Sequence, residues 1–327
     1  MGHETSTPVE IQYGGFGKLP QQGDFIRVST QSRELEAWER WLQHGLLYSR
    51  NVLASEWEHA YHQGLHHWFV FRPDNSKSTV VGVIRAASDA HHRRYPFTCF
   101  ALIPTALLDG SPSLLPRLHD ALFSDLEQRI EDASALVHLG DIQERLKEPR
   151  SLVVDLSREA DRYDNFLDEL ECRDLGSTCG VEGTSLLAEL LTLLQHVRHN
   201  PRQCPVTLEL PLQGSPHTRS LELRFWIELC LLAMGWYPGT LSLFWPAREL
   251  PARSNALLLS MRQPPAPLFG ALITTAGRNG LVWLPGRDAS PFGRESAPFS
   301  WLRSATSLRT VLSTLSPGYP DACRWNT

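Results

Sequence analysis

The sequence predicts an α+β fold, in which helices flank a mixed and largely antiparallel sheet. Two observations lead to this class. Short strand-like runs follow one another across tight turns in the N-terminal third, with one long helix before them and one after them. The chain has 327 residues, of which 42% are hydrophobic, so it can bury a full core. We expect an N-terminal domain over residues 1–135 and a second α/β lobe over 136–327, with 136–180 as an acidic connection.

The first elements can be placed from their hydrophobic periods. Residues 9–16 alternate well enough to form a first strand. A helix is expected from about Ser32, because apolar residues from Leu35 to Leu53 recur at steps of three and four while charged residues fill the other positions. A shorter helical segment is expected over residues 55–63.

Three strands and another helix should follow. The strands cover residues 67–71, 79–85 and 97–103, and the turn-forming run Pro73-Asp74-Asn75-Ser76 joins the first two into a hairpin. The next helix runs through Pro116, which a first helical turn tolerates, and continues at least to Ile130. The order β, α, β, β, β, α favours an antiparallel meander over a doubly wound parallel sheet.

The second half is expected to alternate helices with short strands. Two apolar helices should cover about residues 185–198 and 218–234, and the second is hydrophobic on most sides, as a buried helix is. The acidic segment is weakly patterned, and we expect one strand in it, at residues 152–154. Further strands are expected at residues 241–245, 256–260 and 281–284.

The charge of the chain is unevenly distributed around a net value of −5. Residues 1–196 carry 18 basic and 29 acidic side chains, whereas residues 197–327 carry 13 basic and 7 acidic ones. Solvated faces, or an internal match between the halves, would explain this asymmetry, and so would an acidic docking surface for a partner. The dilute basic half has no Lys/Arg run, so we expect no binding of nucleic acid.

The remaining composition indicates a cytoplasmic protein. Six scattered cysteines without a CxxC pair argue against a zinc site or a disulfide framework and fit reduced thiols. The N-terminus has no features of a signal peptide. The most apolar stretch, residues 229–237, is too short to span a bilayer. We therefore expect no insertion into membranes.

The run from Gly15 to Phe25 is the most informative part of the chain. A shaped turn is expected here, because glycine permits unusual backbone angles and proline fixes one. The residues that shape this motif turn are Gly15, Phe16, Gly17, Pro20 and Gly23. Two charges, Lys18 and Asp24, are held on it. It is not a phosphate-binding loop, since Leu19 stands where that motif needs Ser or Thr and the glycine spacing differs.

A second polar segment, residues 88–98, lies between two expected strands. The guanidinium groups of Arg93 and Arg94 are fork-shaped donors suited to carboxylate or phosphate. If this loop folds beside the motif turn, Lys18, Asp24, Asp89 and Arg93 converge. Two interpretations stay open, a functional polar cluster and a purely structural ion-pair lock. The complete set of candidate residues for partner binding is Lys18, Asp24, Asp89, Arg93, Arg94 and Tyr95.

No other constellation carries recognisable chemistry. His59, His62 and His66 could share a helix face, but no acidic residue or cysteine joins them at the spacing of a metal motif. The chain has no GxSxG elbow and no cysteine in a catalytic context. We assign no metal, no cofactor and no catalytic residue.

The two polar segments together resemble TagF (also called ImpM), an accessory family of bacterial type VI secretion systems. Gly15 to Phe25 matches its first hallmark without a gap, and the tryptophan-containing pattern from Trp38 to Arg50 within the first expected helix is similar to the next family segment. The loop from Ser88 to Thr98 is also similar, except that His92 stands where glycine is usual, which puts the path of its backbone in doubt. A looser similarity covers residues 242–269.

This resemblance implies a longin- or profilin-like N-terminal fold and a cytosolic regulator that represses assembly of the secretion apparatus after translation. It implies a forkhead-associated scaffold protein as partner and a functional link to a threonine kinase and phosphatase pair. Ten tryptophans, a residue type favoured at binding hot spots, agree with a non-enzymatic binding protein. The alternative is a small hydrolase or transferase that uses Lys18, Asp24, Asp89 and Arg93. A third hypothesis is phosphopeptide recognition by Arg93 and Arg94.

Overall fold

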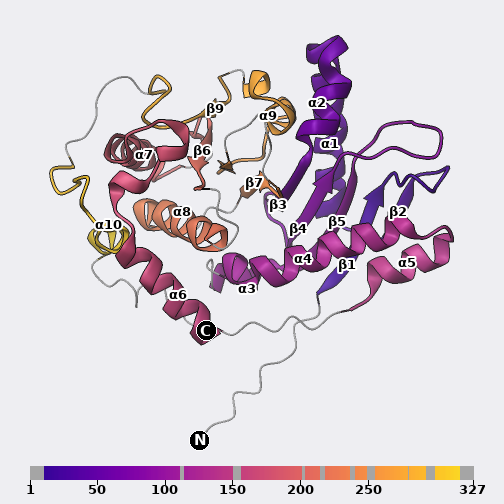
Figure 1. Cartoon of the computed structure of the whole chain (residues 1–327), viewed down its shortest axis with the longest axis horizontal. Coiled ribbons are helices and arrows are strands. Elements are labelled where there is room, and N and C mark those ends of the chain that lie inside the picture. Colours follow the sequence, from indigo (N-terminus) through magenta and orange to yellow (C-terminus); the bar gives the residue numbers. More distant parts are fainter. Residues whose placement is uncertain are drawn as a thin grey trace, which may run out of the picture.

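A single nine-stranded sheet forms the centre of the computed structural model (Figure 1). The structure describes residues 11–110, 114–149, 156–200, 203–213, 218–235, 240–248, 255–278, 280–291 and 299–316. The strand order is β2-β1-β5-β4-β3-β7-β8-β6-β9. Only β6 and β9 pair in parallel, and every other pair of neighbours is antiparallel. The predicted fold class is therefore confirmed.

The elements alternate along the chain as follows. The strands are β1 (Gln12–Gly17), β2 (Ile26–Val28), β3 (His66–Arg72), β4 (Ser78–Arg85), β5 (Phe97–Pro104), β6 (Thr207–Pro211), β7 (Leu241–Pro246), β8 (Ala256–Ser260) and β9 (Val282–Trp283). The α-helices are α1 (Arg33–Leu53), α2 (Trp57–Gly64), α3 (Thr105–Gly110), α4 (Leu114–Ala135), α5 (Leu139–Lys147), α6 (Leu156–Glu169), α7 (Gly183–Val197), α8 (Arg219–Met234), α9 (Leu268–Ile273) and α10 (Leu308–Leu315).

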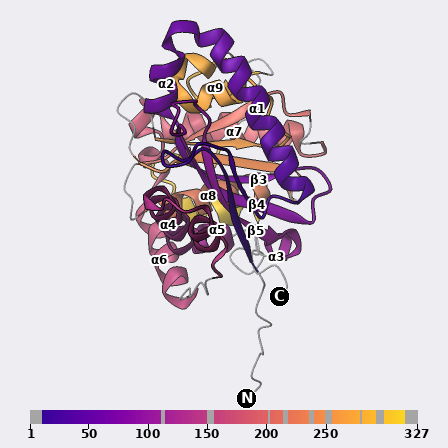
Figure 2. The same ribbon diagram turned by 90° about the vertical axis from the view of Figure 1, so that its right-hand side faces the viewer.

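Helices cover both faces of the sheet, so the molecule has three layers (Figure 2). Helices α1, α2 and α9 pack on one face, and α3 to α8 with α10 pack on the other. The strands are buried on both sides and still follow the two-residue period of a pleated sheet. In β3, for example, Phe69 and Phe71 belong to the core under α1, while Val70 belongs to the core under α4.

Helix α1 begins where the sequence predicts it. The Ser32 hydroxyl accepts a hydrogen bond from the Leu35 amide at 3.2 Å and caps the helix. The apolar stripe then lays Trp38 flat on Phe69, with ring centroids 3.9 Å apart. Six tryptophans of the described residues are buried in the core: Trp38, Trp41, Trp57, Trp226, Trp245 and Trp283. The tryptophan content therefore reflects core packing and does not support the inferred binding hot spots.

The sheet runs without a break from the N-terminal to the C-terminal half. Strand β3 pairs with β7 over six residue pairs, from His67 opposite Pro246 to Arg72 opposite Leu241. Aromatic packing crosses the same junction, because Trp41 of α1 stacks on Phe244 of β7 at 5.2 Å between centroids. The boundary expected between residues 135 and 136 stays a prediction, but any division there cuts one sheet.

Several elements were not predicted. Strands β2 and β6 and helices α9 and α10 are additional to the expected order. The acidic segment 136–180 holds the helices α5 and α6 in place of weakly patterned chain. The expected strand at residues 152–154 lies outside the described residues. In the described part of the chain, no helix combines the length and the apolar character that crossing a membrane requires.

Candidate functional site

The two polar segments meet at one end of the sheet, at the right-hand edge of Figure 1. We call residues 18–25, which follow β1, and residues 86–96, which connect β4 to β5, the motif loops. The Ala90 amide donates to the Gln22 carbonyl at 2.9 Å, which ties the loops together. The Gln22 side chain in turn donates to the Val137 carbonyl between α4 and α5 at 2.7 Å. The two motif loops and the connection between α4 and α5 therefore form one surface.

Asp89 is the centre of this arrangement. Its carboxylate is fully buried and lies 3.0 Å from the Lys18 Nζ and 2.7 Å from the Arg93 Nε. The backbone amides of His91 and Arg93 also donate to it, at 3.0 and 2.9 Å. Burial alone would raise the pKa of Asp89, but the Arg93 backbone and the Lys18 and Arg93 side chains outweigh it and hold the pKa far below its usual range.

The same carboxylate shapes its own loop. The Asp89 amide donates to the Arg93 carbonyl at 3.2 Å, which closes a three-residue hairpin turn over residues 90–92. Such turns place their last residue in the left-handed region, usually as glycine. His92 takes this place with φ of 59°. The loop therefore keeps the backbone path that glycine would favour, although the residue type differs from the family pattern.

Replacing His92 with glycine should raise the free energy of unfolding by about 0.5–1 kcal/mol, since relief of left-handed strain exceeds the added chain entropy. Thermal melting measures the change. The matched control is His91→Gly, one residue earlier, where φ is not positive and stability should fall. A lower melting temperature for His92→Gly than for the native chain would contradict the assigned backbone conformation.

Gly17, the last residue of β1, lies in close contact with the second motif loop at Pro96. Its φ is 128°, a conformation that side chains disfavour, and a Cβ placed there would lie 2.1 Å from the Pro96 carbonyl oxygen. Of the other motif-turn residues, Gly15 and Phe16 belong to β1. The Gly23 carbonyl accepts a hydrogen bond from the Arg93 Nη2 at 2.5 Å. Pro20 is exposed at the tip.

The remaining candidate residues do not join the cluster. Arg94 turns to α2, where its Nη1 lies 2.7 Å from an oxygen of Glu58. The Tyr95 ring packs edge-on against Phe25 with centroids 4.9 Å apart. Asp24 is exposed and has no hydrogen-bond or ion-pair partner among the described residues. The structure therefore brings together Lys18, Asp89 and Arg93 only.

This geometry is that of an ion-pair lock. Asp89 has no exposed oxygen and meets four donors, so it cannot act as a base or nucleophile without losing its partners. Both cations are engaged by the same carboxylate, and only the Arg93 side chain is substantially exposed, at 57%. Within the described ranges, no group of three or more His, Cys, Asp or Glu residues is arranged to hold a metal ion.

The surface around the lock offers contact groups of a different kind. Val137 and Leu139, beside the Gln22 contact, are 64% and 48% exposed. They stand next to exposed polar loop tips, which include Gln21, His91 and His92. Nothing in the sequence indicated that the α4–α5 connection reaches the motif loops, because Gln22 and Val137 are 115 residues apart.

The comparisons with known proteins cover the chain unequally. Residues 14–148 match the TagF N-terminal domain, which is described as type VI secretion system-associated. Among solved structures, the crystal structure of PA0076 from Pseudomonas aeruginosa PAO1 is similar with a TM-score of 0.49 and 18% identity, over 81% of this chain and 94% of that one. No protein with a curated description matches.

Proposed function

We propose that this chain, whose residues 14–148 match the TagF N-terminal domain, regulates a bacterial type VI secretion system by binding a partner protein. In this proposal it acts in the cytoplasm as a repressor of apparatus assembly after translation. Its partner is a forkhead-associated scaffold protein, and its action is linked to a threonine kinase and phosphatase pair. It needs no cofactor and catalyses no reaction.

One observation supports binding above catalysis: three charged residues of the motifs, Lys18, Asp89 and Arg93, hold the motif loops together. Lys18 and Arg93 are both bound to the buried Asp89, so the cluster fixes the shape of the surface. A preformed surface favours association, because fewer groups must be ordered when the partner binds.

The same geometry argues against the two other hypotheses. A hydrolase or transferase would need Asp24 near the cluster and an accessible carboxylate, yet Asp24 stands apart and Asp89 is buried. Recognition of a phosphopeptide by Arg93 and Arg94 would need free guanidinium groups, and these are bound to Asp89 and Glu58. We therefore do not propose either activity for this surface.

We place the docking contact at Val137 and Leu139 together with the tips of the motif loops. An exposed apolar pair within a polar rim has the composition of a small interface centre. The chain offers a matched comparison, because Leu47 and Val52 on α1 are also exposed, at 61% and 53%, and lie on the opposite layer of the molecule.

The double variant Val137→Glu/Leu139→Glu should weaken binding to the purified forkhead-associated scaffold at least tenfold, because two charges replace apolar contacts. Bio-layer interferometry with the full chain measures the affinity, and Leu47→Glu/Val52→Glu serves as the control that should bind normally. Equal affinity of both variants would remove this surface from the proposal.

The regulatory role has a separate test in cells. Overproduction of the native chain should lower type VI secretion into the medium, and the Val137→Glu/Leu139→Glu variant should not. Unchanged secretion on overproduction, together with no binding of the native chain to the scaffold, would overturn the proposed function.

A further inference from the structure

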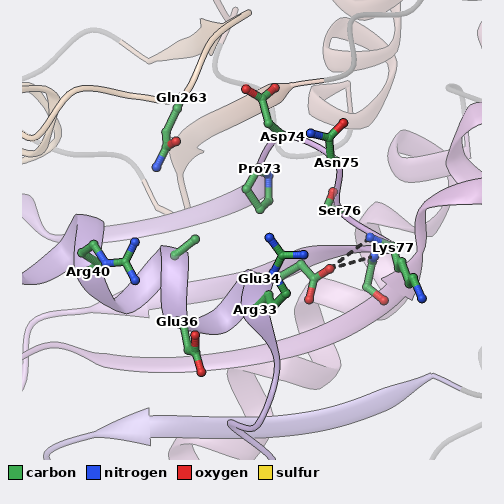
Figure 3. Close-up of a pocket in the computed structure, with 12 residues that line it drawn as sticks. Arg33, Glu34, Glu36, Arg40, Pro73, Asp74, Asn75, Ser76, Lys77 and Gln263 are labelled. Atoms are coloured by element: carbon green, nitrogen blue, oxygen red, sulfur yellow. Dashed lines mark hydrogen bonds between the residues drawn. The ribbon is translucent and has the colours of Figure 1, made fainter.

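We infer that a pocket at the start of α1 binds an acidic segment of a partner protein, a site distinct from the motif loops. The pocket has a volume of about 490 Å³ and lies between α1, the β3–β4 turn and Gln263 (Figure 3). Strand β4 runs from Ser78 at this pocket to Arg85 before the motif loop, so the two surfaces lie at opposite ends of the strand. The inference does not depend on the proposed function.

One face of α1 forms the floor of the pocket. Arg33, Glu36, Ala37 and Arg40 line it and follow one another at steps of three, one and three residues. This spacing places them on a single helix stripe. The first turn of the helix adds the positive end of the helix dipole close to Arg33.

The basic side chains of the pocket are uncommitted. The charged groups of Arg33, Arg40 and Lys77 have no ion-pair or hydrogen-bond partner in the part of the chain that the structure describes. This is unusual for arginines of the N-terminal half, many of which meet a carboxylate. Examples are Arg27, Arg85, Arg93, Arg94, Arg129 and Arg145.

Two of the three acidic side chains of the pocket, Glu34 and Asp74, have partners, whereas Glu36 is exposed and has none among the described residues. The Glu34 carboxylate is buried and accepts hydrogen bonds from the amides of Lys77 at 3.0 Å and Ser78 at 3.4 Å. Asp74 accepts a hydrogen bond from the Thr240 hydroxyl. Glu36 forms no ion pair with either arginine, and Figure 3 shows its carboxylate directed away from Asp74 and Gln263. An incoming anion therefore meets three unpaired cations and the single unpaired carboxylate of Glu36.

The wall opposite α1 adds neutral polar groups. Ser76 is one of the lining residues, but its hydroxyl oxygen is inaccessible to solvent and has no hydrogen-bond partner among the described residues. Asn75, with φ of 54°, turns the chain so that the loop closes over the helix. The lining is thus polar and charged, unlike the apolar lining of most small-molecule pockets.

The size and spacing of the basic groups favour a peptide over a single ion. Arg33 and Arg40 are seven residues apart, about 10 Å along the helix, which is farther than one carboxylate or phosphate spans. An extended chain covers the same distance in about three residues, so two acidic side chains of one segment can reach both guanidinium groups. Three cations beside Glu36 and Asp74 are too few for the basic footprint of a nucleic-acid site.

The test measures fluorescence anisotropy with a fluorescein-labelled hexaglutamate peptide and the full chain at low salt. Arg33→Gln/Arg40→Gln should weaken binding at least tenfold, and added salt should weaken binding to the native chain. The matched control, Arg50→Gln/Arg248→Gln, removes the same charge from two exposed arginines outside the pocket and should bind normally. Thermal melting of both double variants should equal that of the native chain.

Four outcomes would overturn the inference. The first is no binding of hexaglutamate by the native chain, and the second is an equal loss of binding in both double variants. The third is a labelled oligothymidine that binds more tightly than hexaglutamate and loses affinity in the pocket variant. The fourth is inorganic phosphate that displaces hexaglutamate at an equal concentration of charge. This result would show that a free anion is enough to fill the pocket and would contradict a peptide site.

Discussion

Replacing Gly17 with alanine is expected to destabilise the protein by about 3–5 kcal/mol, which combines backbone strain with overpacking. The added methyl group would lie 2.1 Å from the Pro96 carbonyl oxygen and 2.8 Å from the Phe97 Cα. Both atoms belong to the backbone of the second motif loop and its strand, so neither can move aside alone. The substitution should therefore separate the motif loops as well as lower stability.

Denaturant unfolding of the full chain measures the loss. The control is Gly140→Ala in α5, where an added Cβ meets no atom within 4 Å and alanine should leave stability equal or slightly higher. A Gly17→Ala protein that unfolds at the same denaturant concentration as the control would show that the loops do not make the close approach described above.

Replacing Asp89 with asparagine should produce the second large effect, a fall in melting temperature of roughly 10 °C at neutral pH. The change leaves Lys18 and Arg93 close together without the carboxylate that binds both. Asp24→Asn is the matched control, because it removes an exposed carboxylate of the neighbouring loop that has no partner among the described residues. Equal melting temperatures for the two variants would contradict the ion-pair lock.

The effect of Asp89→Asn should also depend on pH. The pKa of Asp89 is lower in the folded protein than the value of about 3.9 expected in the unfolded chain. The carboxylate therefore stabilises the fold above about pH 4, and this contribution is lost as the pH falls towards the folded pKa. The difference in melting temperature between the native chain and Asp89→Asn should narrow from pH 7 to pH 3. A constant difference would assign the effect to something other than this carboxylate.

Strong periodicity made most of the fold predictable. The stripe of α1 and the hairpin of β3 and β4 follow from local pattern and turn chemistry, and their ends agree with the structure to within two residues. Helices α5 and α6 were missed because acidic residues dominate their exposed faces. Their buried positions, Ile142 with Leu146 and Tyr163 with Leu167, are four apart and carry the helical period.

The candidate site was only partly predictable. Asp89 and Arg93 lie in one loop, and the sequence alone allowed this loop to fold beside Lys18 without requiring it. The partners of Arg94 and Gln22 could not be inferred, because Glu58 and Val137 come from other elements and carry no local signal. Strand β6 was not predicted, and its pairing with β8 and β9 is set by contacts between residues far apart in the sequence.

The pairing of β3 with β7 has a consequence for any fragment of this chain. A protein truncated after residue 148 would leave β3 as an open edge, with unsatisfied backbone groups that invite pairing with another molecule. The ring of Trp41 would lose the cover of Phe244 at the same time. An isolated N-terminal domain should therefore self-associate through this strand, unless a foreign strand takes the vacant place.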